Sequence, residues 1–384
     1  MLIIVALEAL FWGALTLFIY AYFVYPLLMA GIAGRAKAVP AAANQNRLPS
    51  VAVLVAAFNE EKCIAARIEN LLQQDYPCEQ LQITVGSDGS ADHTVEIARE
   101  FSDARITVHE FRVNRGKASV LNDLVAHASA DILVFTDANT VFERDTVRQL
   151  VTALDEQTGA VCGELILEAH RSGSNQDHRY WNFERRLKAA ESSIGGLLGA
   201  NGGVYAIHKK YYKPLRQDTI CDDFVIAMNI AVEGRGLRYI PAAVAFEDAP
   251  TDVITEFHRR VRIGIGNYQT LFRHPQYLLS GSRALSFTYF SHKVLRWLTP
   301  HLLILMLATS LFLSGDQIYR AAFQLQLVGY GAGIAVFYLR NRIAWPNSIR
   351  AALFFAVLNF AFLVAFMRFV AADHSGSWRR TERA

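Results

Sequence analysis

The chain has 384 residues, 52% of them hydrophobic, and a formal net charge of only +3. Soluble domains are about 45–50% apolar, and here the excess is concentrated at the two ends of the chain. The small charge and the lack of a basic stripe with interleaved aromatic residues exclude nucleic-acid binding. The four cysteines are scattered without Cys-x-x-Cys spacing, which argues against a zinc site and a disulfide framework and predicts buried free thiols in a reducing compartment.

Residues 1–34 are predicted to form a transmembrane helix. The segment from Leu2 to about Ile32 is almost continuously apolar, and about 20 such residues span a bilayer. Because no basic residue precedes Arg35, the basic start of a signal peptide is missing, which indicates a retained anchor. Residues 35–49 are predicted to be a linker, and their basic side chains place the next domain in the cytoplasm by the positive-inside rule.

Residues 50–275 alternate between strand and helix patterns. Strands are predicted at Val51–Phe58, Leu81–Val85, Arg105–Glu110 and Ile132–Phe135, and helices at residues 59–74, 93–101 and 118–127. Such alternation indicates an α/β domain with a parallel sheet. Ligands of these sheets bind at the carboxyl ends of the strands. Phe58, Asp88 and Asp137 follow three of the strands, so we expect them to converge.

Asp137 and Asn139 follow the fourth strand with a spacing of two residues, which puts them on the same side of the chain. Their oxygens suit a hard divalent cation that also holds substrate phosphates. A polar turn after a strand is the alternative. The first strand-to-helix turn, residues 56–60, has no GxGxxG pattern, which argues against a dinucleotide site, and no Walker A loop occurs.

Four motifs in this order carry a resemblance to a known family. They are Ala57-Phe58-Asn59-Glu60-Glu61, Ser87-Asp88-Gly89-Ser90-Ala91-Asp92, Asn114-Arg115-Gly116-Lys117-Ala118 and Thr136-Asp137-Ala138-Asn139-Thr140. Together they resemble the membrane-bound family 2 glycosyltransferases, which include cellulose, hyaluronan, chitin and poly-N-acetylglucosamine synthases. The resemblance covers roughly residues 50–275. It implies a nucleotide-sugar-binding domain of the GT-A type, flanked by transmembrane helices.

The resemblance also implies roles on the donor side. Phe58 and Glu60 would lie against the base and ribose, and Asp88 would hold the uracil end of a UDP-sugar. Lys117 would lie near the donor, with a solvated lysine at a helix start as the alternative. Asp137 matches the first acid of the family's Asp-x-Asp metal motif, whereas Asn139 replaces the second. The implied cofactor is Mg²⁺ or Mn²⁺, held by Asp137 and Asn139.

On the acceptor side, helices are predicted at residues 141–158 and Trp181–Leu198, the second with a solvated charged face, and strands at Ala160–Leu167 and Val204–Ile207. Similar turns in the family border the sugar pocket, which implicates Gly202 and Gly203. Asp222 and Asp223 precede an apolar helical pattern through Val232. They match the family's Thr-Glu-Asp motif, in which the last acid is the catalytic base, so Asp223 would be the base. Helix capping is the alternative for both acids.

Arg259, Arg260 and Arg262 lie close together in the chain, and guanidinium groups pair with phosphate oxygens. We therefore predict that Arg259 and Arg262 bind the donor diphosphate, with a membrane-surface helix as the alternative. Processive synthases of the family carry Gln-x-x-Arg-Trp at this position. Only Arg262 matches, because Arg259 replaces the Gln and Ile263 replaces the Trp. This departure argues against processive synthesis.

Residues 276–297 are predicted to be an interfacial amphipathic region, residues 298–372 two or three transmembrane helices, and residues 373–384 a polar tail. The apolar stretches are about 298–313, 318–339 and 349–372. Three full spans would put the arginines of the tail outside, against the positive-inside rule. Two and three spans therefore both stay open.

The resulting prediction is a multi-pass enzyme of the inner membrane with a cytoplasmic catalytic domain. It would transfer a sugar, with inversion, from a nucleotide-sugar to a polysaccharide or a lipid-linked acceptor. Membrane lipid, and export or assembly proteins, would be its further partners. The alternatives are a non-processive polyprenyl-linked sugar transferase and a non-catalytic membrane partner with the same fold.

Overall fold

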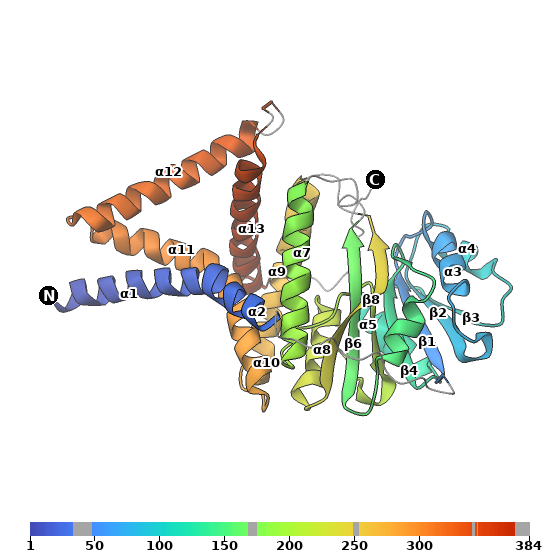
Figure 1. Ribbon diagram of the computed structural model, residues 1–384. Coiled ribbons are helices and arrows are strands. Elements are labelled where there is room, and N and C mark those ends of the chain that lie inside the picture. Colours follow the sequence, from blue (N-terminus) through green and yellow to red (C-terminus); the bar gives the residue numbers. More distant parts are fainter. Residues whose placement is uncertain (34–47, 168–174, 249–252, 340–341, 344, 373–384) are drawn as a thin grey trace. The chain divides into compact units, whose positions relative to one another are not determined.

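The computed structural model describes residues 1–33, 48–167, 175–248, 253–339, 342–343 and 345–372 (Figure 1). Nearly all of the predicted linker and the whole polar tail lie outside these residues. The chain divides into two compact units. The membrane-type unit comprises residues 1–29, 256–271 and 290–374, and the sheet unit comprises the rest. We describe each unit by itself.

The sheet unit is built on an eight-stranded sheet of order β3-β2-β1-β4-β7-β6-β8-β5. Its strands are β1 (Val51–Ala57), β2 (Leu81–Asp88), β3 (Ile106–Phe111), β4 (Ile132–Asp137), β5 (Val141–Phe142), β6 (Thr158–Leu167), β7 (Tyr205–His208) and β8 (Gly236–Glu247). The first four strands in this order are parallel, as predicted. Beyond them the sheet is mixed: β7 runs antiparallel to β4 and β6, and β5 antiparallel to β8, whereas β6 and β8 are parallel.

The helices of this unit are α3 (Ile64–Leu72), α4 (Thr94–Arg99), α5 (Lys117–His127), α6 (Thr146–Thr152), α7 (Asn175–Ser193), α8 (Asp222–Val232) and the short α10 (Arg283–Thr288). Short 3₁₀ turns occur at Cys78–Gln80, Lys209–Tyr211 and Pro275–Tyr277. The prediction of a helix from residue 59 was wrong. Asn59 has a positive φ of 55°, which a right-handed helix does not allow, so the helix begins only at Ile64.

The predicted helix over 141–158 is also shorter in the structure. Its first residues form β5 instead, because Val141 and Phe142 pair with the end of β8. The Asn70 side chain bonds both backbone groups of Phe142 from the other side, at 2.8 and 2.9 Å. Strand β8 was not predicted. It pairs with β6 over most of its length, and its inward residues Leu237, Tyr239, Ala243 and Ala245 are buried. Pro241 interrupts the alternation that would have indicated this strand.

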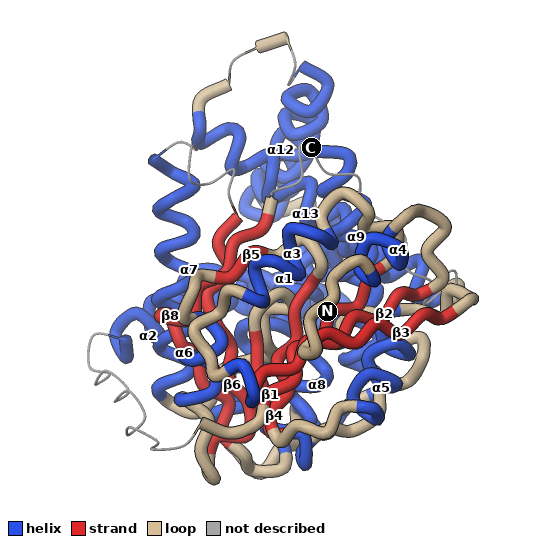
Figure 2. Tube along the Cα trace, turned by 90° about the vertical axis from the view of Figure 1, so that its right-hand side faces the viewer, coloured by secondary structure: helices blue, strands red, loops and turns tan. Residues whose placement is uncertain are grey.

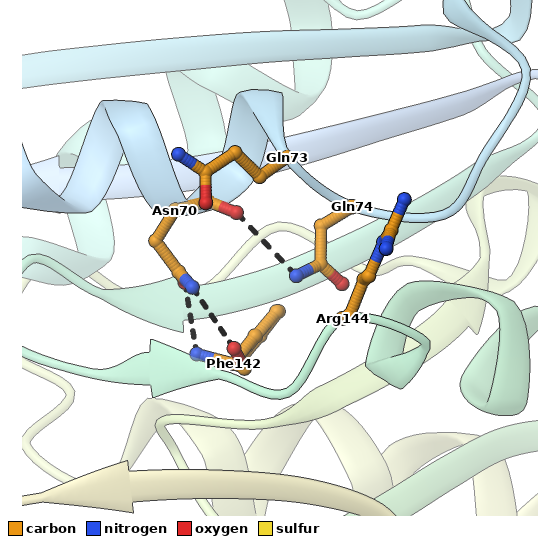
Figure 3. A pocket seen from close by; sticks show the side chains of 5 residues that line it. All are labelled: Asn70, Gln73, Gln74, Phe142 and Arg144. Carbon is orange, nitrogen blue, oxygen red and sulfur yellow. Dashed lines mark hydrogen bonds between the residues drawn. The ribbon is translucent and has the colours of Figure 1, made fainter.

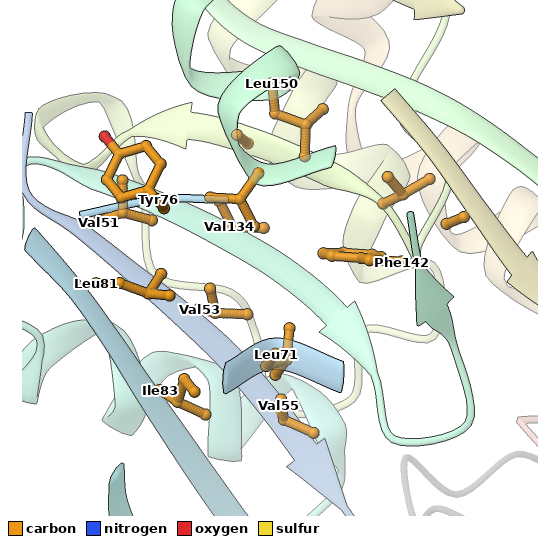
Figure 4. Packing of buried hydrophobic residues seen from close by; sticks show 14 of the residues in the cluster. Val51, Val53, Val55, Leu71, Tyr76, Leu81, Ile83, Val134, Phe142 and Leu150 are labelled. Atoms are coloured by element: carbon orange, nitrogen blue, oxygen red, sulfur yellow. The ribbon is translucent and has the colours of Figure 1, made fainter. Parts of the chain in front are cut away.

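The main core lies between the sheet and the helices α3 and α6 (Figure 4). Every residue of β1 is buried, as expected for a parallel strand covered on both faces. Its odd-numbered residues Val51, Val53 and Val55 face this core. Helix α5 covers the opposite face (Figure 2), where a side chain at Gly86 would collide with Val120 and Leu124. Because both faces are covered, ligands can reach the parallel strands only at their ends.

The membrane-type unit contains α1 (Leu2–Ile19), a π-helical turn η1 (Tyr20–Val24), most of α2 (Tyr25–Ala33) and most of α9 (Val253–Arg273), followed by the π-helical turn η6 (Tyr289–Val294), α11 (Leu295–Phe312), α12 (Gln317–Leu339) and α13 (Asn347–Val370). In the part of the chain that the structure describes, four helical runs are long and apolar enough to span a membrane: 2–32, 283–312, 317–339 and 347–370. Residues 283–297 of the predicted interfacial region form one helical run with the next apolar stretch, through Phe312, and their interfacial location stays a prediction. By length and composition three of these runs lie in the C-terminal part of the chain, and the number of C-terminal spans stays a prediction.

Candidate active site

The ammonium group of Lys117 connects two of the predicted site aspartates. Lys117 Nζ lies 2.8 Å from Asp137 Oδ1 and 3.4 Å from Asp222 Oδ2. The three residues come from the start of α5, the end of β4 and the start of α8. Only 21% of the Lys117 side chain is exposed, so the alternative of a solvated lysine is wrong. The structure thus brings together a cation and two acids that are far apart in sequence.

Asp223, the predicted base, is half-buried beside this ion pair. Burial and the neighbouring Asp222 carboxylate raise the pKa of Asp223 to about 6, against the attraction of Lys117. Its Oδ1 accepts a hydrogen bond of 2.8 Å from the Phe224 backbone. The N-cap of α8 is Cys221, so neither acid occupies the capping position itself. A carboxyl group with a raised pKa next to a second acid is the arrangement expected of a general base.

The glycine turn that precedes β7 borders this acid. A Cβ placed on Gly202 would lie 3.2 Å from Asp223 Oδ2, and one on Gly203 would lie 2.9 Å from Thr140 Oγ1. Glycine therefore lets the turn approach both side chains closely. The turn therefore lies beside Asp223, and its predicted place at the sugar pocket stays a prediction.

Asp88 is fully buried at the end of β2. Its two oxygens accept hydrogen bonds from the backbone of Arg115, at 2.8 Å, and of Gly116, at 2.9 Å. Gly116 is the N-cap of α5 and has a positive φ of 89°. Asp88 therefore holds the start of α5, which carries Lys117, against β2. Its predicted contact with the base of the donor stays a prediction.

The turn with Phe58 and Glu60 is tied to the end of β2. The Asn59 backbone donates to Ser90 Oγ at 3.0 Å, and the Asn59 side chain accepts from the Ala91 backbone at 2.9 Å. The Glu60 backbone donates to Thr94 Oγ1 at 2.8 Å. The turns after β1 and β2 thus form one surface at the carboxyl edge of the sheet, with Phe58 half-buried in it.

Asn139 lies in the turn after β4, half-buried. Its amide nitrogen donates to Glu247 Oε1 at 3.1 Å. Glu247 ends β8 and was not singled out in the sequence. The two predicted metal ligands therefore have partners of opposite charge: Asp137 bonds the Lys117 ammonium, and Asn139 bonds the Glu247 carboxylate.

Sequence reasoning also missed Arg67, which is only 2% exposed. Its guanidinium donates to Thr136 Oγ1 at 2.7 Å and to Asn70 Oδ1 at 2.6 Å, and it lies 4.2 Å from the centre of the Phe142 ring. Burial lowers the pKa of Arg67 to about 9, and the charge of Asp137 opposes that shift. Arg67 therefore remains a buried cation behind Asp137. The signal was its position on the apolar face of α3, three residues after Ile64 and one before Ile68.

The charged helix α7 differs from its predicted solvated face. Glu191 is buried, and Lys188 Nζ donates to Asn201 Oδ1 at 2.9 Å. Arg185 pairs at 3.2 Å with Glu164, which is also buried. Only part of the charge run is therefore solvated.

Arg259 and Arg262 lie on α9 in the other unit, where Arg259 pairs with Glu256 at 3.8 Å. Their predicted diphosphate contact stays a prediction. Among the cysteines, Cys162 is buried, Cys63 and Cys221 are half-buried and Cys78 is exposed, so the prediction of buried thiols is confirmed only for Cys162.

The donor atoms at the site suit a hard cation that also binds the substrate. No group of three or more acidic, histidine or cysteine side chains is placed for metal binding among the described residues. Mg²⁺ and Mn²⁺ at nucleotide sites take one or two protein carboxylates and fill the other positions with phosphate oxygens and water. Asp137, already bonded to the Lys117 ammonium, accepts a positive charge in this position. The residues therefore fit a metal that arrives with its diphosphate.

A surface pocket of about 360 Å³ lies elsewhere, lined by Asn70, Gln73, Gln74, Phe142 and Arg144 (Figure 3). The Asn70 side chain there is occupied by the backbone of Phe142, and Gln74 donates to the Asn70 backbone at 3.4 Å. None of the predicted site residues lines it. The predicted site residues therefore lie at the strand ends and not at this pocket.

The central region matches known proteins. Residues 52–213 match the family model described as Glycosyl transferase family 2. The poly-beta-1,6-N-acetyl-D-glucosamine synthases of Staphylococcus aureus (strain COL) and Staphylococcus epidermidis are each 26% identical, over 242 and 243 residues. The matches cover 60% and 59% of this chain and 57% of each relative. The chain thus matches less than two thirds of the length of these relatives.

A solved structure extends the likeness to most of the chain. It is the mannosyltransferase PcManGT from Pyrobaculum calidifontis in complex with GDP-Man and Mn²⁺. It superposes with a TM-score of 0.73 over 97% of this chain and 99% of the other, at 23% identity. At this identity the likeness shows the fold.

Proposed function

We propose that the protein is an inverting glycosyltransferase, because residues 52–213 match the family 2 glycosyltransferase model and the fold is GT-A-like. It transfers a sugar from a nucleotide-sugar, first of all a UDP-sugar, to a polysaccharide or a lipid-linked acceptor at the membrane. The observation that carries the proposal is the ion pair of Lys117 with Asp137 and Asp222, beside Asp223. A donor diphosphate and an acceptor hydroxyl would meet there.

The residues divide the chemistry between them. Asp223 takes the proton of the acceptor hydroxyl, whose oxygen attacks the anomeric carbon as the bond to the diphosphate breaks. Lys117 offsets the negative charge that develops on the departing diphosphate. Asp137 and Asn139 would hold Mg²⁺ or Mn²⁺, which when bound neutralises the diphosphate charge. Attack opposite the leaving group inverts the anomeric configuration.

We place the protein in the inner membrane with its sheet unit in the cytoplasm, where nucleotide-sugars are made. Four helices of sufficient length and apolarity support the membrane location. Export or assembly proteins would act as partners if the product is a polysaccharide.

Release of the nucleoside diphosphate tests this function. Purified full chain in detergent, with Mn²⁺, is incubated with a panel of UDP- and GDP-sugars with and without cell-derived lipid acceptors. We expect release with at least one donor, and loss of release after chelation of the metal. No release from any donor, and no binding of one, would contradict the proposal.

A non-processive, polyprenyl-linked sugar transferase is the second candidate, and Ile263 favours it. Processive synthases of the family have a tryptophan at this position, which borders the acceptor channel. Radiolabelled donor distinguishes the two, since single addition gives one lipid-linked product and processive synthesis gives long polymer. The ion pairs of Lys117 with Asp137 and Asp222 argue against a non-catalytic partner protein.

The pH dependence of sugar transfer is expected to follow the ionisation of the Asp223 carboxyl group. The base acts only when ionised, and its pKa is raised to about 6. At saturating metal, kcat/KM should therefore be level above this pH and fall about tenfold for each pH unit below it. Donor binding, measured by calorimetry over the same range, is the control. A profile level down to the ordinary carboxyl pKa of about 4 would remove Asp223 as the base.

A further inference from the structure

Glu247 lies next to the metal motif for a topological reason. Strand β5 pairs with the end of β8, so that Val141 is opposite Phe246 and Phe142 opposite Ala245. The residue after Phe246 therefore faces the turn that joins β4 to β5. This register brings the Glu247 carboxylate to Asn139, and the amide nitrogen of Asn139 donates to it at 3.1 Å.

The contact has two consequences for the Asn139 side chain. An amide has one donor and one acceptor end, and the donor end is committed to Glu247. The carbonyl oxygen, the only end that can bind a cation, is therefore directed away from Glu247. The contact also places the negatively charged Glu247 carboxylate at hydrogen-bonding distance from Asn139, a predicted metal ligand without charge of its own.

We propose that Glu247 is a positioning residue of the metal site, which orients the Asn139 amide and supplies the negative charge that Asn139 lacks. The inference rests on the proposed function, because it requires a cation at Asp137 and Asn139. Partners behind metal ligands commonly orient the ligands and strengthen their donation, and their loss costs about 10–100-fold in metal affinity. Asn139 and Glu247 together would then carry the charge of one aspartate.

The substitution Glu247→Gln separates this role from a merely structural one. Glutamine has the same shape, and its Oε1 accepts the Asn139 hydrogen bond, so a structural tie between the turn and β8 survives. The negative charge does not. Mn²⁺ affinity is measured by electron paramagnetic resonance of free Mn²⁺, with full chain in detergent and saturating UDP. We expect the dissociation constant for Mn²⁺ to rise about tenfold or more at an unchanged melting temperature.

The double variant Asn139→Asp with Glu247→Gln moves the negative charge from position 247 to position 139. The hydrogen bond between the two side chains is kept, with the glutamine amide as its donor. We expect it to recover Mn²⁺ affinity to within about threefold of the native chain, because the full charge and the hydrogen bond are both kept. The matched control is Glu233→Gln, which removes a carboxylate that is paired with Lys213 at the surface. This control should leave the Mn²⁺ affinity unchanged.

The outcomes separate the inference from the function on which it rests. If the native chain with UDP binds no Mn²⁺, the proposed metal-dependent function fails. If the native chain binds Mn²⁺ and Glu247→Gln binds it equally well, only the role of Glu247 is overturned. A double variant as weak as Glu247→Gln would likewise overturn the sharing of one charge between the two positions.

Discussion

Replacement of Asp223 by asparagine is expected to reduce sugar transfer by about 10²–10⁴-fold, the usual contribution of a general base. Asparagine has nearly the same shape and can still accept the hydrogen bond from the Phe224 backbone, so the start of α8 should be preserved. Binding of donor and metal should be preserved as well, because in the structure the Lys117 ammonium pairs with Asp137 and Asp222. Single-turnover transfer and calorimetric donor binding measure the two effects.

The same substitution should make the folded protein more stable at neutral pH. The pKa of Asp223 is raised to about 6 in the folded protein, above its ordinary value, so folding disfavours the ionised form. This cost is present above the folded pKa and disappears below the ordinary pKa. The melting temperature of Asp223→Asn should therefore exceed that of the native chain at neutral pH, with the difference lost in acid. Full transfer activity in this variant would remove Asp223 as the base.

Replacement of Arg67 by alanine is expected to cost about 3–5 kcal/mol of stability, the usual effect of removing one partner from a buried charged network. It empties space behind β4, and Thr136 and Asn70 lose their donors. It also removes the buried cation whose charge acts on Asp137. At about 2–4 °C per kcal/mol for a domain of this size, the melting temperature should fall by roughly 6–20 °C.

Arg99→Ala is the matched control, because Arg99 pairs with Glu110 at the surface, with 54% and 45% of their side chains exposed. Exposed ion pairs contribute about 0–1 kcal/mol. Melting curves in detergent should therefore separate the two arginine variants clearly. Equal melting temperatures would show that the buried Arg67 network contributes no stability.

The sequence predicted the part of the fold in which each strand can be identified from its own run of apolar residues. Strand β1 is one apolar run that ends at a polar turn, and the parallel strands around it follow from strict alternation with helices. The same reasoning put Asp137 at a strand end and Asp223 at a helix start. Their convergence around Lys117 needed no more than the shared edge of the sheet and the order of the family's motifs.

What the sequence could not predict depends on pairings between distant segments. Strand β8 pairs with β6 and with the short β5, and neither pairing can be predicted from one segment alone. Pro241 also interrupts the alternation of apolar and polar residues that would indicate β8. Glu247 could not be connected to Asn139 without that register. From the sequence alone Arg67 is an ordinary helical arginine, because the burial of its helix face is not known. Asp88 accepts hydrogen bonds from the backbone at the start of α5, and residue spacing does not predict these partners.

The central claim is that the edge of the sheet around Lys117, Asp137 and Asp223 binds a nucleotide-sugar together with a divalent cation. Calorimetric titration of the full chain with UDP-sugars and GDP-sugars, with Mn²⁺ and with chelator, tests it most directly. We expect saturable binding of one donor class that is lost on chelation and strongly weakened in Asp137→Asn. Donor binding that is the same with chelator and in Asp137→Asn as in the native chain with Mn²⁺ would contradict it.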